Sequence, residues 1–195
     1  SSEEISLFDL LKASMRQRPD YILVGEIRGE EAYTLFQAMS TGHLGLATLH
    51  AESVEAGLRR LETAPMNIPR MMVAGLNLVI IMARREIEGK AVRKVITCSE
   101  VKGLKDDGEI VVDPLFEWNA KEDVWHLLNE SYYLQKAAKM RGITVDEAKN
   151  DIRMRAEILN FLAEEGKRSF SEVTQVIRNY VTAPETVHES LSGAS

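Results

Sequence analysis

Apolar runs alternate with amphipathic stretches over the first third of the chain, which predicts alternating strands and helices. Leucines at helical spacing predict a helix over 6–18, and the proline that follows ends it. Continuous apolar runs at 21–24 and 44–49 are typical of strands buried on both faces. A helical pattern follows each run, at about 30–40 and 53–63. This order favours a right-handed parallel α/β layer.

The periodicity changes beyond residue 65. A helix is predicted over 70–78, leading into a further strand at 79–83. After that strand, short apolar segments alternate with polar turns, which is the pattern of an antiparallel meander. The predicted meander strands are 91–101, 109–112 and 123–127.

The last third of the chain has a helical pattern. The predicted helices are 132–141, 144–163 and 169–180. Thr144 and Glu147 have the spacing of a capping box at the start of the second of these helices. The composition becomes helix-rich and charged near residue 129. We therefore expect an α/β core with a meander at 1–129, a helical appendage at 130–182 and a disordered tail at 183–195.

Composition restricts the class of protein. The 195 residues are 45% apolar and 28% charged, as in globular proteins, and a net charge of −6 offers no basic field to nucleic acid. Cys98 is the single cysteine, so no intrachain disulfide or cysteine metal site forms and a reducing cytoplasm is expected. The longest nearly apolar run, 71–83, has 13 residues, short of the roughly 20 that cross a bilayer. We expect a cytoplasmic chain that binds no nucleic acid.

The strongest candidate for chemistry is an acidic residue that directly follows a predicted buried strand. Glu26 comes just past the carboxyl end of the run at 21–24, where parallel α/β sheets bind ligands. A glutamate there can orient or deprotonate a water that attacks a phosphoryl group, and Arg28 can offset phosphate charge. The alternative is a surface turn whose Glu–Arg pair contributes little.

Two histidines flank the second predicted strand. His43 and His50 are seven residues apart, or about 23 Å in extended chain at roughly 3.3 Å per residue, so they cannot bind one metal ion. We expect no metal site. His50 leaves the strand at the same edge as Glu26, whereas His43 enters at the opposite edge. Only His50, with Thr48 just before it, is placed to sense a ligand at that edge. The alternative is a histidine with a purely structural role.

Arginines form a third group of candidates, because arginine suits phosphate contacts and reaches across subunit interfaces. Most arginines are simply solvated, which is the alternative for each. The group comprises Arg16, Arg18, Arg28, Arg59, Arg60, Arg70, Arg84 and Arg85. The sequence contains neither a Gly-x-x-x-x-Gly-Lys-Ser/Thr phosphate loop nor a Gly-x-Gly-x-x-Gly motif.

Two motifs together resemble a known family. Residues 18–29, RPDYILVGEIRG, and 41–51, TGHLGLATLHA, are similar to the Walker B and histidine boxes of the type II/type IV secretion ATPase superfamily. Members are the hexameric motors of pilus assembly, type II secretion and the archaellum. Residues 59–70 and 116–119 resemble the archaeal pilus and archaellum branch. The resemblance is dense over residues 6 to about 130 and implies a RecA-like C-terminal ATPase core with a mainly parallel sheet.

The resemblance assigns roles to individual positions. Glu26 corresponds to the catalytic glutamate of the Walker B box, and Gly25 stands where ordinary Walker B motifs have an aspartate, so magnesium ligation from here is not expected. His43 and His50 correspond to the box histidines. Arg28, Thr48 and the histidines would sense nucleotide or stabilise the transition state. Arg16 and Arg18 are candidates for interface arginines.

The resemblance also implies parts that the sequence does not contain. The family's N-terminal domain, phosphate loop and acidic box are expected before residue 1. We therefore expect the C-terminal portion of a hexameric motor, inactive alone and binding no cofactor tightly by itself. The full-length form would use ATP and Mg²⁺ and meet an integral membrane platform protein at the cytoplasmic membrane. One alternative is a non-catalytic regulatory or assembly module that lost the phosphate loop. Another is an unrelated α/β binding domain that carries both motifs by coincidence.

Overall fold

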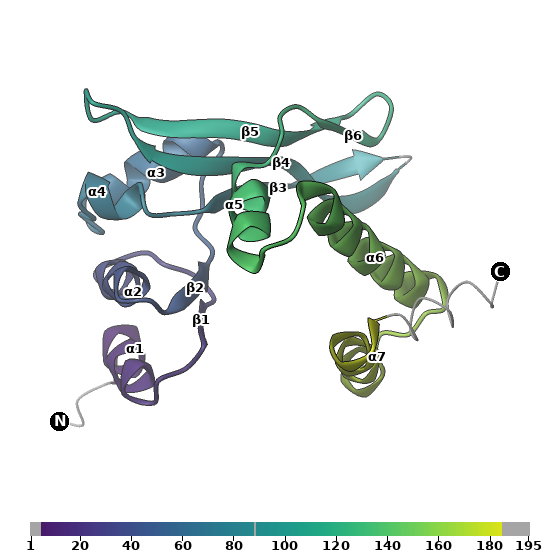
Figure 1. Ribbon diagram of the computed structural model, residues 1–195. Helices are drawn as coiled ribbons and strands as arrows, with labels where there is room; N and C mark the ends of the chain where they lie inside the picture. The colour runs from purple at the N-terminus through teal and green to yellow at the C-terminus, as the bar shows by residue number, and fades with distance from the viewer. Residues whose placement is uncertain (1–4, 88, 185–195) are drawn as a thin grey trace. The chain divides into compact units, whose positions relative to one another are not determined.

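The computed structural model describes residues 5–87 and 89–184, which form two compact units (Figure 1). Within the described residues, the first unit runs to residue 132 and contains both β-sheets, and the second begins at residue 133 and is helical. Most of the predicted tail at 183–195 lies outside the described residues. None of the helices in the described part of the chain is both long and apolar enough to cross a membrane. The α/β class predicted from the sequence is confirmed.

The first unit begins with alternating helices and strands, as predicted. These elements are α1 (Leu7–Arg16), β1 (Tyr21–Val24), α2 (Glu31–Ser40), β2 (Leu44–Ala47) and α3 (Val54–Glu62). Local signals set the helix starts, because capping side chains satisfy backbone N–H groups that have no partner within the helix. Ser6 and Asp9 form a capping box at α1, and the Ser53 side chain caps α3.

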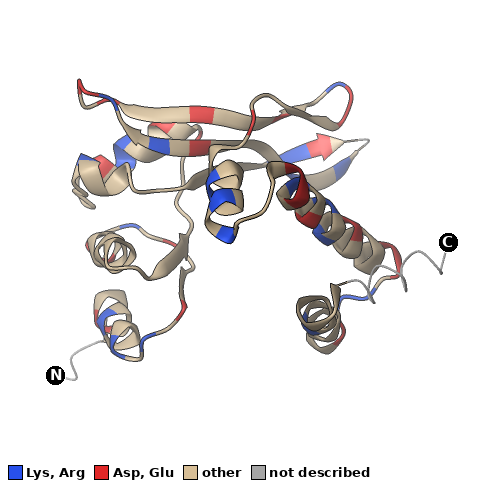
Figure 2. Cartoon of the chain, in the orientation of Figure 1, with Lys and Arg blue, Asp and Glu red and all other residues tan. Residues whose placement is uncertain are grey.

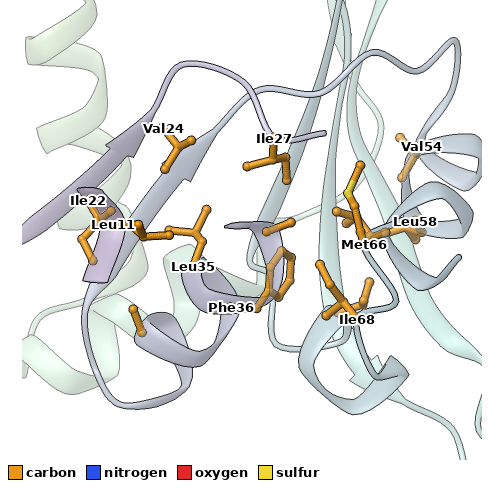
Figure 3. Close-up of a cluster of buried hydrophobic side chains, with 14 residues drawn as sticks. Leu11, Ile22, Val24, Ile27, Leu35, Phe36, Val54, Leu58, Met66 and Ile68 are labelled. Atoms are coloured by element: carbon orange, nitrogen blue, oxygen red, sulfur yellow. The ribbon is translucent and has the colours of Figure 1, made fainter. Parts of the chain in front are cut away.

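β1 and β2 pair in parallel, with Tyr21 opposite Leu44 and Val24 opposite Ala47. The helix between them makes the crossover connection that a parallel pair requires. One face of this pair is buried: Ile22 and Val24 pack into the main core of the unit (Figure 3). That core also contains side chains of α1, α2, α3 and the segment before α4. Burying each large apolar side chain contributes about 1.5–3 kcal/mol.

The rest of the unit forms an antiparallel sheet rather than an extension of the parallel one. After the short helix α4 (Arg70–Val73), the strands are β3 (Leu78–Ile87), β4 (Lys90–Leu104), β5 (Ile110–Asn119) and β6 (Val124–Leu127). They lie side by side in sequence order (Figure 1). The meander was predicted, but the mainly parallel sheet was not correct for the described residues, where two strands pair in parallel and four are antiparallel.

The predicted strand at 79–83 is present, but it is longer than expected. It is part of β3, which continues through Arg84, Arg85 and Glu86 and pairs with β4 across a two-residue connection. Parallel strands need a crossover of a dozen or more residues, so this short connection forces antiparallel pairing. The charged residues that looked like the end of a strand instead continue it along an exposed hairpin.

The second unit contains the helices predicted for it, namely α5 (Tyr132–Arg141, beginning at the unit boundary), α6 (Val145–Glu164) and α7 (Phe170–Thr182). The predicted capping box of Thr144 and Glu147 is present at α6, and a second one begins α7. Figure 2 shows charges of both signs along α6, whereas the charged residues of α5 are all basic. The small core between α6 and α7 consists of Ile158, Leu162, Val173, Val176 and Tyr180.

Candidate functional site

The carboxyl ends of β1 and β2 meet at one edge of the parallel pair, and their pairing continues past both strands. The Ile27 N–H donates to the Thr48 carbonyl at 2.9 Å. The Thr48 hydroxyl donates to the carbonyl of Gly25. These two bonds hold the segment that carries Glu26 beside the segment that carries His50. Thr48 therefore ties the two segments together, a use of its hydroxyl that the sequence did not indicate.

The carboxylate of Glu26 is shared between two basic side chains. Its Oε2 accepts a hydrogen bond from Nη2 of Arg28, and its Oε1 lies 3.0 Å from Nε2 of His50. The Glu26 side chain is 26% exposed, against 71% for Arg28 and 79% for His50. The acid is therefore the enclosed member of the group, and both basic groups face solvent.

A helix outside the two motifs also contributes to the site. Arg60 of α3 donates from Nη1 to the backbone carbonyl of His50 at 2.8 Å. This bond fixes the backbone that carries the imidazole. The sequence analysis placed Arg60 only in a general group of arginines, because no spacing along the chain reveals that α3 reaches back to this loop.

The loop that carries Arg28 is held by an acidic residue that the sequence analysis did not select. Glu31 Oε1 accepts the backbone N–H of Arg28 at 2.6 Å and that of Gly29 at 2.9 Å. A usable signal was present in the sequence, since an acidic residue in the first turn of a helix interacts with exposed backbone N–H groups. Glu31 thereby orders the start of α2 and the backbone of Arg28.

Electrostatics keep these acids ionised. The hydrogen bond from Arg28 lowers the pKa of Glu26, against a partial burial that would raise it, and the positive charges of Arg28, His50 and Arg60 act in the same direction. The same pairing raises the pKa of Arg28. The pKa of Glu31 is also lowered. Burial alone would raise it, but the hydrogen bonds from the backbone N–H groups of Arg28, Gly29 and Glu31 together outweigh the effect of burial. Glu26 is an anion at neutral pH.

Three predicted site residues lie at the other edge of the parallel pair. His43 precedes β2, where its N–H donates to the Ala38 carbonyl at 3.1 Å and its Nδ1 lies 3.3 Å from the same oxygen. Arg16 is in the last turn of α1, and Arg18 precedes β1 in a left-handed backbone conformation with φ of 50°. The structure therefore brings together Glu26, Arg28, Thr48 and His50, and it does not bring the other three to them.

The donor set determines which ligand this edge can take. Arg28 and His50 present a guanidinium and an imidazole to solvent, which suits the oxygens of a phosphate group. Metal ligands are lacking: the described residues contain no group of three His, Cys, Asp or Glu side chains arranged to hold an ion, and Gly25 offers no side chain. Within the described part of the chain, this edge therefore suits a phosphate group better than a metal ion.

Sequence comparison defines the class of protein. The family described as Type II/IV secretion system protein matches residues 1–191. The chain belongs to this family, which confirms the resemblance drawn from the Walker B and histidine boxes.

Individual relatives extend well beyond the matched region. Uncharacterized protein MJ1287 of Methanocaldococcus jannaschii is 43% identical over 178 residues, which are 91% of this chain and 66% of the relative. MJ0900 of the same organism is 36% identical, over 89% of this chain and 32% of its own length. Conjugal transfer protein TrbB of Rhizobium radiobacter is 37% identical over 49% of this chain and 31% of its own. The chain thus spans between 31% and 66% of the length of these relatives.

Among solved structures, the X-ray structure of the Legionella pneumophila ATPase DotB aligns with a TM-score of 0.37 and 16% identity. The alignment covers 97% of this chain and 43% of that one.

Proposed function

We propose that this chain is the C-terminal portion of a hexameric motor ATPase that serves a type II or type IV secretion system, a type IV pilus or an archaellum. The observation that carries the proposal is the Glu26 carboxylate, which is held between Arg28 and His50 at the carboxyl edge of a parallel strand pair. Membership of the Type II/IV secretion system family and the name of TrbB as a conjugal transfer protein support it.

In this proposal Glu26 is the catalytic residue and orients the water that attacks the terminal phosphate. Arg28 and His50 offset the charge of the phosphate, while Thr48 and Arg60 position their loops. Of the two box histidines, His50 is the one proposed to lie near the phosphate.

The residues at the opposite edge have a different proposed role. Motor ATPases of this kind complete their sites with charged groups from a neighbouring subunit. Arg16 and Arg18 are exposed, and we assign them to that neighbour-facing role in a hexamer. His43, which bonds to the end of α2, would set the entry into β2.

One face of the β1 and β2 pair is uncovered, which supports the proposal that this chain is one portion of a longer protein. Tyr21, Leu23, Leu44 and Leu46 share one face of the β1 and β2 pair and are 51–70% exposed. Parallel sheets are normally covered on both faces, and two strands alone are rarely stable. We propose that the remainder of the full-length protein packs on this face and supplies the phosphate loop.

An apolar pocket next to β2 supports the same proposal. The pocket has a volume of about 310 Å³ and lies between β2, α2, α3 and β3, with Leu46 and Ile80 in its lining. β3 is an edge strand, and β2 has a single partner strand among the described residues. Two strand edges that flank an apolar pocket leave room for additional chain.

The cofactors and partners follow from this proposal. ATP and Mg²⁺ would bind to the full-length protein, with the magnesium ligands outside this chain. The isolated chain would be inactive. The full-length hexamer would act at the cytoplasmic face of the membrane, bound to an integral membrane platform protein.

Steady-state ATP hydrolysis tests the proposal. The isolated chain is expected to show background turnover, and the full-length protein measurable turnover. Glu26→Gln in the full-length protein should reduce the rate by at least about 100-fold, the usual cost of losing a general base. Glu30→Gln, which removes the same charge from an exposed neighbour, is the matched control. A full-length protein without turnover would favour the regulatory or assembly module instead.

A further inference from the structure

The Glu26 carboxylate already fills an anion site. Each of its oxygens has its own partner, Nη2 of Arg28 or Nε2 of His50. The two partners are far more exposed than the acid is. An anion that arrives from solvent therefore meets the guanidinium and the imidazole before it meets the carboxylate.

The backbones that carry the two partners are held independently of Glu26. Arg60 holds the backbone carbonyl of His50, and Glu31 holds the backbone N–H groups of Arg28 and Gly29. Because none of these bonds involves Glu26, the backbones of Arg28 and His50 stay in register when the carboxylate moves away. The backbone framework of the anion site is therefore preformed.

Carboxylate and phosphate use the same donors. A guanidinium binds either group through charge-assisted hydrogen bonds, and a phosphate brings more charge and more acceptor oxygens than a carboxylate does. A base that orients water needs an oxygen within hydrogen-bond reach of that water. Each Glu26 oxygen keeps a second acceptor site, but the two basic groups use one site on each oxygen and draw on the carboxylate's charge, so the carboxylate holds a water less strongly until one contact is released.

We infer that Glu26 and a phosphate group compete for Arg28 and His50, and that phosphate binding releases the carboxylate to orient water. This inference rests on the proposed function and adds regulation to it: the site stays self-neutralised until its phosphate ligand arrives. A purely structural cluster, in which Glu26 holds Arg28 and His50 in place for the ligand, predicts the opposite effect of removing the carboxylate charge.

A titration of the isolated chain with inorganic pyrophosphate distinguishes competition from a purely structural cluster. Binding is monitored by NMR of the His50 imidazole and the Arg28 guanidinium. Glu26→Gln is expected to bind pyrophosphate about fivefold more tightly than the wild type, because the charged carboxylate no longer competes for Arg28 and His50. Glu30→Gln carries the same change in charge without those contacts, and its affinity should stay within about twofold of the wild type. ATP should compete with pyrophosphate, and adenosine should not.

A double-mutant cycle tests whether the tighter pyrophosphate binding of Glu26→Gln comes from the loss of its contacts with Arg28 and His50. Adding Arg28→Gln to Glu26→Gln should abolish the gain, and Glu26→Asp, with a shorter side chain, should bind with intermediate affinity. The inference is overturned if Glu26→Gln binds pyrophosphate no better than Glu30→Gln, or if no variant binds it at millimolar concentration. If competition fails while Glu26→Gln still abolishes turnover of the full-length protein, only this inference falls. Intact turnover in that variant would reject the proposed function.

Discussion

Individual contacts decide what the Glu26 carboxylate can do. The acid, the guanidinium of Arg28 and the imidazole of His50 come from two loops that begin at neighbouring strand ends. Two residues that do not touch the carboxylate, Arg60 and Glu31, hold those loops through backbone groups. Changing either of them should alter the site without removing a group that contacts ligand.

Arg60→Gln tests this positioning role. Loss of the bond to the His50 carbonyl should loosen the loop and weaken pyrophosphate binding about threefold, since a hydrogen bond of this kind contributes roughly 0.5–1.5 kcal/mol. The measurement is the same NMR titration, with the His50 ring resonances as the readout. Arg59→Gln, one residue earlier on α3, is the matched control and should bind as the wild type does. Equal affinity for both variants would reject the positioning role.

Part of the site could be predicted from the sequence alone. The convergence of Glu26, Thr48 and His50 was predictable, because parallel strands end at one edge of their sheet. The contributions of Arg60 and Glu31 were not, because they depend on the conformation of loops and on how α3 packs, and neither property leaves a periodic pattern in the sequence.

At the scale of helices and strands, one carboxylate links the three helices that follow the sheets. Asp151 of α6 accepts hydrogen bonds from the Tyr180 hydroxyl at 2.6 Å, from Arg155 at 3.0 and 3.2 Å, and from Arg141 at 3.1 Å. The hydrogen bond from Tyr180, followed by those from Arg155 and Arg141, lowers the pKa of Asp151 from 3.8 to about 2 despite some burial. The link is therefore fully ionised at neutral pH.

The lowered pKa predicts a pH-dependent stability of α6 and α7. Because the folded pKa of Asp151 lies below the unfolded value, the unfolded state binds more protons as the pH falls. The contribution, about 2 kcal/mol from the size of the shift, is complete above pH 4 and is lost as the pH falls toward 2. Urea unfolding at several pH values, monitored by NMR of α6 and α7, measures this contribution.

Asp151→Asn should remove this pH dependence and lower the free energy of unfolding of these helices at pH 7. Asp146→Asn, which removes the same charge from the first turn of α6, is the control and should lose less than about 1 kcal/mol. A carboxyl pKa of Asp151 near 3.8, measured by NMR in the folded chain, would contradict the account.

Helices and strands were predicted well where the sequence marks their ends with capping residues, and less well where it does not. The capping box of Thr144 and Glu147 marked the start of α6, so that helix was predicted closely. The length of β3 was underestimated, because the apolar run that predicted it ends before Arg84 and Arg85. An exposed hairpin tolerates charge on both faces, and hydrophobic patterning alone does not show where such a strand ends.

At the scale of the whole molecule, the uncovered face of the parallel pair makes a testable difference between this chain and the full-length protein. Leu46 is 61% exposed, so Leu46→Lys should change the stability of the isolated chain by less than about 0.5 kcal/mol. If further polypeptide covers this face, the same change should cost the full-length protein more than about 2 kcal/mol, because a charge would be buried.

Urea midpoints of both proteins provide this measurement. Met71→Lys alters a side chain that is 74% exposed on α4 and is the control for adding a charge elsewhere on the surface. Equal effects of Leu46→Lys in the two proteins would show that nothing covers the parallel pair.

The central claim is that Glu26 carries the chemistry of a motor to which this chain contributes one part. Single-turnover hydrolysis of ATP by the full-length protein tests it most directly, because that rate separates the chemical step from nucleotide binding and product release. Glu26→Gln is expected to slow the single-turnover rate by at least about 100-fold while nucleotide still binds. A single-turnover rate equal to that of the wild type would contradict it.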